Sequence, residues 1–148
     1  MGIDFKGRVA IVTGAGGGLG KQHALALAAR GARVVVNDLG GDVHGVGGSV
    51  SAAQAVVDEI RAAGGEAIAN GASVTDFEAV QKMVQQVMDT WGRVDILVNN
   101  AGILRDKSFA KMELADFKLV MDVHVMGAVH CTKAVWPIMQ AQNYGASS

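Results

Sequence analysis

A glycine-rich stretch, TGAGGGLG at residues 13–20, is the first part of this sequence whose residue types and spacing could perform chemistry. Gly14 allows a tight turn, and Gly18 lets the backbone approach a phosphate because no Cβ stands in the way. Gly20 allows close packing of a helix against a strand. A helix that begins here offers free N–H groups and partial positive charge to a pyrophosphate. Methyltransferases and other α/β proteins use similar turns, so the stretch alone is weak evidence for one ligand.

An acidic residue at a suitable distance makes the expected ligand more specific. Asp38 lies 18 residues after Gly20, where a carboxylate can accept hydrogen bonds from both hydroxyls of an adenosine ribose. The same carboxylate repels a 2′-phosphate, and neither Asn37 nor Leu39 supplies an arginine to attract one. A solvated acid at a strand end is the other interpretation, and the glycine loop makes it the weaker one. The sequence therefore predicts NAD rather than NADP as the cofactor.

The elements that must position these residues alternate along the chain. Short β-branched or apolar runs predict strands at residues 8–13, 33–38, 66–70 and 94–100. Apolar spacing predicts helices at residues 18–30, about 53–60, 77–91 and about 115–142. This alternation predicts an α/β fold with a doubly wound parallel sheet in strand order 3-2-1-4. Nothing strand-like follows the last helix, so we expect a small sheet of about four strands.

Composition limits the classes of function. A chain of 148 residues without a linker or repeat predicts a single domain, residues 1–148. The 13 basic and 14 acidic residues leave a net charge of −1, which argues against nucleic-acid binding. The apolar runs are too short to span a membrane. The single cysteine, Cys131, cannot form an internal disulfide and favours a reducing compartment. The histidines lack metal-ligand spacing, so we expect no metal.

Two motifs together resemble the signatures of the short-chain dehydrogenase/reductase family. The glycine loop follows the pattern TGxxxGxG, and NNAG at residues 99–102 comes directly after the fourth predicted strand. The stretches VVVNDLGGD, GVG, NNAGILRDKSFA and VHVMGA are similar to the (3R)-hydroxyacyl-CoA dehydrogenase domain of type 2 peroxisomal multifunctional enzymes. That likeness extends over essentially the whole chain, up to Tyr144 and Gly145.

The resemblance implies an NAD-dependent oxidoreductase. Such an enzyme transfers a hydride between the nicotinamide and a secondary alcohol or ketone, here a 3-hydroxyacyl-CoA-like thioester or another small carbonyl substrate. The resemblance also implies a homo-oligomer, with Met121, Met126, Trp136 and Met139 of the last helix as contact residues. We expect a cytoplasmic protein, or one of the peroxisomal matrix if the organism is a eukaryote.

The resemblance assigns cofactor-binding roles by position. Gly14, Gly18 and Leu19 would lie against the pyrophosphate, with Gly20 packed beneath it and Asp38 on the adenosine ribose. The family often has Asp-Val beside the adenine, where this chain has Ser73 and Val74. Ser73 could hydrogen-bond the adenine edge, or it could cap a helix together with Thr75 and Asp76. The nicotinamide-ribose side would be lined by Asn99, Ala101 and Gly102, with Asn99 also tying neighbouring strands together.

The catalytic positions of the family match poorly. The family uses Asn, Ser, Tyr and Lys, with the Tyr-Lys pair as YxxxK providing the acid/base. His124 stands at the Asn position, where it could hold a water in a proton path or be a helix histidine satisfied by a neighbour. Tyr144 is followed at the fourth position by Ser148 rather than lysine, so we assign it no catalytic role. We therefore expect the chain to be truncated before the Ser and YxxxK positions, and to bind the cofactor without an acid/base. The alternative is a non-enzymatic NAD-binding or protein-interaction domain.

Overall fold

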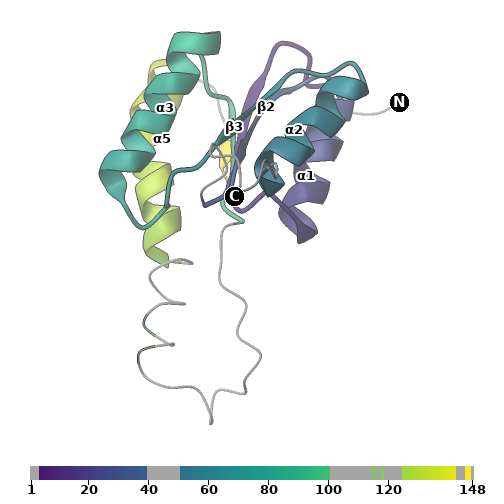
Figure 1. The fold of residues 1–148 in the computed structure, drawn as a ribbon. Coiled ribbons are helices and arrows are strands. Elements are labelled where there is room, and N and C mark those ends of the chain that lie inside the picture. Colours follow the sequence, from purple (N-terminus) through teal and green to yellow (C-terminus); the bar gives the residue numbers. More distant parts are fainter. Residues whose placement is uncertain are drawn as a thin grey trace.

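The computed structural model describes residues 4–39, 51–100, 115, 118, 125–142 and 146–147. A parallel sheet lies between two layers of helices. Figure 1 shows α1 and α2 on one face of the sheet and α3 and α5 on the other. Separate apolar clusters fill the two interfaces, one packed against each pair of helices.

The sheet has strand order β3-β2-β1-β4-β5, and every neighbouring pair is parallel. The strands are β1 (Val9–Val12), β2 (Arg33–Asn37), β3 (Ala67–Asn70), β4 (Ile96–Val98) and β5 (Ala146–Ser147). All of β1 is buried, as is β2 after its first residue, because helices cover both faces of a parallel sheet. This confirms the predicted doubly wound fold and the 3-2-1-4 order.

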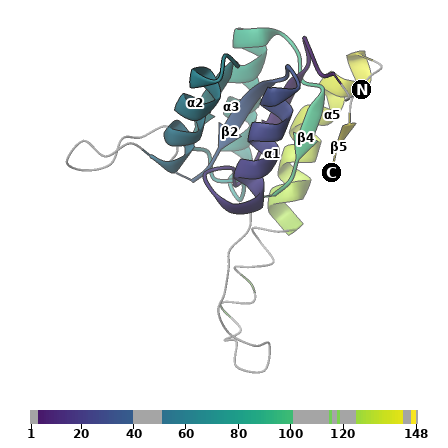
Figure 2. The ribbon, with the colours of Figure 1, turned by 90° about the vertical axis from the view of Figure 1, so that its right-hand side faces the viewer.

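The last strand differs from the prediction. We expected nothing strand-like after the final helix, but Ala146–Ser147 pairs with β4, with Ala146 opposite Ile96 and Ser147 opposite Leu97. Figure 2 shows this short strand beyond β4, on the side of the sheet away from β2. Two residues carry no periodic pattern that could be recognised in a sequence, so only the pairing with β4 identifies them as a strand.

The helices are α1 (Gly18–Ala29), α2 (Ala52–Ala62), α3 (Phe77–Trp91) and α5 (Gly127–Gln142). The apolar period of α3 buries Val80, Val84 and Val87, and Gly92 ends the helix in the left-handed conformation, as its spacing predicted. Within the described segments, no helix combines the length and the apolar character that a bilayer span requires.

A buried carboxylate connects the start of β4 to its neighbours. Asp95 is fully buried, and its Oδ2 accepts a hydrogen bond of 2.9 Å from the Val9 backbone N–H. Arg93 donates to both carboxylate oxygens at 2.7 Å. Burial raises the pKa of Asp95, but the hydrogen bonds from Arg93 and Val9 and the positive charge of Arg93 outweigh it and leave the pKa below its ordinary value. Gln142 then attaches the end of α5 by donating to the Val94 carbonyl at 2.9 Å.

Candidate functional site

The candidate site lies where the strand order reverses. Because β2 and β4 flank β1 on opposite sides, the carboxyl ends of β1 and β4 form the switch point at which doubly wound sheets bind ligands. The glycine loop follows β1, and Asn99 and Asn100 follow β4. The fold therefore brings both sequence motifs to one edge of the sheet.

The backbone of the glycine loop turns at two glycines. Gly14 and Gly18 have φ of 62° and 56°, a left-handed conformation that favours glycine. A Cβ on Gly20 would overlap the Gly14 carbonyl oxygen and would lie 2.5 Å from Asn100 Nδ2, so this position needs glycine for close packing. Leu19 projects into solvent with 70% of its surface exposed.

The amino end of α1 is suited to an anion. Gly17 is the N-cap residue and provides no side-chain hydrogen bond, and the first turn contains no acidic residue. The N–H groups of the first turn therefore keep their hydrogen-bonding capacity and the positive end of the helix dipole. These features fit a pyrophosphate.

Asp38 reaches the glycine loop directly. Its Oδ2 accepts a hydrogen bond of 2.8 Å from the Gly16 backbone N–H. Residue 16 must be a glycine for this contact, since a Cβ on Gly16 would overlap Asp38 Oδ2. A carboxylate has two oxygens, and only Oδ2 makes this bond. The second oxygen suits a ribose hydroxyl beside the pyrophosphate position. The sequence motif did not single out Gly16, because its pattern fixes Gly14, Gly18 and Gly20 alone.

Asn100, and not Asn99 as predicted, connects the ends of the neighbouring strands β1 and β4. The Asn100 N–H donates to Thr13 Oγ1 at 3.0 Å, and its side chain donates to the Gly14 carbonyl at 3.2 Å. Successive residues of an extended chain point to opposite faces of the sheet, so only one asparagine of the pair can lie on the face that carries α1 and the glycine loop. Asn99 instead points toward α5, where its Nδ2 donates to Thr132 Oγ1 at 3.4 Å.

Asn99 also carries an unsatisfied acceptor. Its Oδ1 is buried and has no hydrogen-bond partner among the residues that the structure describes. Such an atom costs about 1–3 kcal/mol unless a donor reaches it. A ribose hydroxyl at the predicted nicotinamide side would supply that donor.

Ser73 and Val74 form the predicted adenine rim, which follows β3. Ser73 is not a helix cap, because Asp76 is the N-cap of α3 and its side chain accepts from the Ala79 N–H at 3.2 Å. The Ser73 hydroxyl instead lies 2.8 Å from the hydroxyl of Thr75. The Val74 side chain is buried in the core, so Val74 can present only backbone atoms to a ligand.

The remaining predicted residues lie outside the described part of the chain. These are Ala101, Gly102, His124, Met121 and Tyr144. Within the described residues, no group of three or more His, Cys, Asp or Glu side chains could hold a metal ion.

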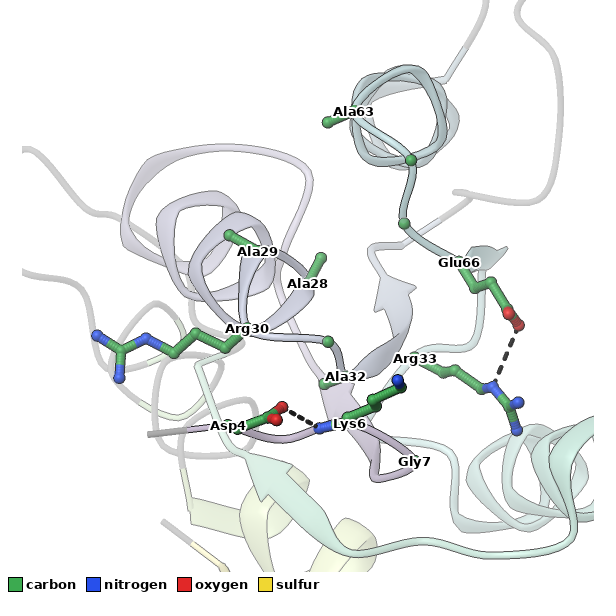
Figure 3. Close-up of a pocket in the computed structure, with 13 residues that line it drawn as sticks. Asp4, Lys6, Gly7, Ala28, Ala29, Arg30, Ala32, Arg33, Ala63 and Glu66 are labelled. Atoms are coloured by element: carbon green, nitrogen blue, oxygen red, sulfur yellow. Dashed lines mark hydrogen bonds and ion pairs between the residues drawn. The ribbon is translucent and has the colours of Figure 1, made fainter. Parts of the chain in front are cut away.

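A pocket lies at the edge of the sheet opposite the candidate site. Figure 3 shows its lining, which includes the ends of α1 and α2 and a solvent-exposed ion pair of 3.2 Å between Arg33 and Glu66. Its volume is about 690 Å³. Arg33 begins β2, so this pocket lies at the amino ends of the strands. Doubly wound sheets bind ligands at the other edge, and we therefore assign no cofactor contact to it.

The contact residues predicted on the last helix, about residues 115–142, divide into two sets. Met139 is buried in the core, which corrects its assignment as a contact residue, whereas Met126 and Trp136 are exposed by 42% and 58%. An apolar groove of about 530 Å³ adjoins Trp136 and includes Val129 and Pro137.

Comparisons with known proteins agree with this geometry. Residues 8–146 match the short chain dehydrogenase family. The chain is 55% identical over 143 residues to peroxisomal multifunctional enzyme type 2 of Mus musculus and 57% identical over 145 residues to peroxisomal multifunctional enzyme A of Dictyostelium discoideum. These alignments cover 97% and 98% of this chain, but 19% and 32% of the relatives.

Two solved structures share the fold. A short chain dehydrogenase from Mycobacterium avium is 47% identical with a TM-score of 0.83, over 94% of this chain and 48% of that one. A 7α-hydroxysteroid dehydrogenase complexed with NADH and 7-oxo glycochenodeoxycholic acid is 37% identical with a TM-score of 0.84, over 97% of this chain and 52% of that one.

The fold, with both sequence motifs at the carboxyl edge of its sheet, defines a doubly wound α/β protein of the Rossmann type. The chain belongs to the short-chain dehydrogenase family. The relatives also confirm the predicted similarity to type 2 peroxisomal multifunctional enzymes, although this chain spans about half or less of the length of the proteins compared above.

Proposed function

We propose that this chain binds NAD and provides the cofactor half of a dehydrogenase site. The observation that carries the proposal is the hydrogen bond from the Gly16 N–H to Asp38 Oδ2. It holds a carboxylate beside a glycine loop and an uncapped helix N-terminus, which is the arrangement that binds a dinucleotide. The neighbour complexed with NADH, at 37% identity, supports a nicotinamide cofactor.

The preference for NAD over NADP follows from charge. A 2′-phosphate would lie beside the Asp38 carboxylate and be repelled, and the next residue, Leu39, is exposed and carries no positive charge. The pyrophosphate would lie on the N–H groups of α1, and the nicotinamide ribose near Asn99. When bound, the nicotinamide accepts or donates the hydride.

The reaction we propose interconverts a 3-hydroxyacyl and a 3-oxoacyl thioester. Its support is the 55–57% identity to peroxisomal multifunctional enzymes, together with a Saccharomyces cerevisiae relative named peroxisomal hydratase-dehydrogenase-epimerase, which is 54% identical. The alternative of a non-enzymatic binding domain is not favoured, because these relatives are named as enzymes. The relatives named peroxisomal support the peroxisomal matrix over the cytoplasm as the location.

We also propose that a second copy of the chain covers the exposed apolar face of α5. Val129 and Trp136 leave 47% and 58% of their surfaces exposed beside the apolar groove. Large exposed apolar side chains on one helix face are typical of an oligomer contact. Analytical ultracentrifugation of wild type and Trp136→Glu tests this, with a shift to monomer expected for the variant.

Fluorescence titration tests the cofactor proposal. NADH should bind the folded chain, and NADPH should bind at least about tenfold more weakly, since one lost or repelled charged contact is worth about 1.4 kcal/mol or more. A folded chain that binds no NADH at millimolar concentration would contradict the proposal. The substrate is tested separately, by following NADH oxidation by the whole enzyme with a 3-oxoacyl-CoA and with a free ketone of the same length.

A further inference from the structure

His130 is a residue of α5 to which neither the sequence motifs nor the proposed function gives a role. It is half-buried, and its Nδ1 lies 2.8 Å from the carbonyl oxygen of Val74. Its ring packs on Phe77 with centroids 5.4 Å apart and planes tilted by 47°. A carbonyl oxygen can only accept, so Nδ1 carries the proton of this bond.

The Val74 side chain contacts the same helix. Val74 is 6% exposed, and a Cβ on Gly127 would lie 2.6 Å from Val74 Cγ2, so the helix backbone passes very close to it. His130 comes three residues after Gly127, so both residues lie on the same face of α5. The backbone and the side chain of Val74 are therefore both fixed by α5.

Two asparagines of the sheet, Asn37 and Asn70, hold Ala72, which lies two residues before Val74. Asn37 Nδ2 donates to the Ala72 carbonyl at 3.0 Å and to Asn70 Oδ1 at 3.1 Å. Asn70 Oδ1 also accepts from the Ala72 N–H at 2.8 Å. Asn37 directly precedes Asp38, so this network links the ribose carboxylate to the start of the adenine rim. Ser73 is held between these contacts on one side and His130 on the other.

We propose that His130 is a positioning residue for the adenine subsite. By donating Nδ1–H to the Val74 carbonyl, it fixes the backbone of Ser73 and Val74 at the spacing from Asp38 that adenosine requires. It touches no reacting atom, and its effect is on cofactor affinity. This inference rests on the proposed function, since it needs the adenine to lie at Ser73 and Val74.

Two substitutions separate the hydrogen bond from packing. His130→Leu keeps an apolar side chain against Phe77 and removes the donor. His130→Asn places an amide N–H at the position of Nδ1 and restores the donor. His23→Leu is the matched control, because His23 is an exposed histidine of α1 on the other face of the sheet.

The experiment measures dissociation constants for NADH and ADP-ribose at a temperature where melting curves show each protein folded. His130→Leu should weaken both ligands by about 3- to 10-fold, the effect of one hydrogen bond, while His130→Asn and His23→Leu stay within about twofold of wild type. Equal affinity of His130→Leu and wild type would overturn the inference. Failure of wild type to bind either ligand would instead overturn the proposed function.

A measurement on the unmodified chain keeps the test independent of variant stability. Imidazole ¹⁵N chemical shifts should show the His130 proton on Nδ1 in the neutral form, with or without NADH. A neutral ring that carries its proton on Nε2 would exclude the bond to Val74 and overturn the inference even if His130→Leu does not fold.

Discussion

Substitution of Gly20 by alanine tests whether the glycine loop packs as closely as the structure indicates. Gly20 is buried in the first turn of α1. An added Cβ would overlap the Gly14 carbonyl oxygen and lie 2.5 Å from Asn100 Nδ2. The first of these neighbours is backbone, and the second is a side chain that donates to that same carbonyl at 3.2 Å. Neither can move without disturbing the end of β1 or β4.

Two effects of opposite sign determine how much Gly20→Ala changes the free energy of unfolding. Alanine is favoured over glycine inside a helix by roughly 0.8–1 kcal/mol, so propensity alone predicts a more stable variant. Overpacking in a close-packed region costs about 1–3 kcal/mol. Because the nearest overlap is with backbone, we expect a steric cost in the upper part of this range, about 2–3 kcal/mol. The net effect then lowers the free energy of unfolding by about 1–2 kcal/mol, which corresponds to a decrease in Tm of about 3–8 °C for a chain of this size.

Thermal and urea unfolding of two variants checks this prediction. Gly17→Ala is the matched control, because Gly17 lies in the same loop, has an extended backbone with φ of −171°, and would have no atom within 4 Å of an added Cβ. It should unfold within about 0.5 kcal/mol of wild type. If Gly20→Ala were as stable as wild type, or more stable, the close packing of α1 on the ends of β1 and β4 would be refuted.

Substitution or labelling of four single residues provides the other tests. Asp38→Asn should weaken NADH binding by about 10- to 100-fold, since hydrogen bonds to a charged acceptor are lost. Leu39→Arg should strengthen the binding of NADPH relative to that of NADH, and if the ratio of these two dissociation constants stayed as in wild type, Asp38 would be excluded from the ribose site. The pKa of Asp95 is lower in the folded chain, so the stability that its carboxylate contributes is complete above the ordinary pKa of 3.8 and is lost as the pH falls through the folded pKa. In urea melts, Asp95→Asn should therefore lose less of its free energy of unfolding at acid pH than wild type does, and an identical pH dependence would contradict this. Burial raises the pKa of Cys131 to about 12, so a thiol reagent at about pH 8 should react slowly with the folded chain and fast in urea, and rapid native labelling would count against its burial.

The sequence predicts the fold well where a local pattern determines it. The apolar period of α3 and its terminal Gly92 are local signals, and the structure reproduces both. The order of the first four strands follows from right-handed crossovers between parallel strands. The tight turn predicted at Gly14 likewise agrees with its positive φ of 62°.

The sequence predicts less where neighbouring residues of similar type compete. Asn99 and Asn100 have the same chemistry, and the phase of the strand pleat decides which one lies on the face with α1 and the glycine loop. Ser73 and Asp76 are both good helix caps, and the choice depends on where packing starts α3. The His130 contact joins residues 56 positions apart, so no local pattern could indicate it.

Amide chemical-shift mapping with NADH tests the central claim most directly, because it reports both binding and place. In a ¹⁵N-labelled chain, saturating NADH should shift the amides of the glycine loop, Asp38, Ser73 and Asn99, all at the carboxyl edge of the sheet. The amides around Arg33 and Glu66, which line the pocket at the opposite edge, should stay unchanged. Shifts confined to that opposite edge, or none at all in a folded chain, would contradict cofactor binding at the carboxyl edge.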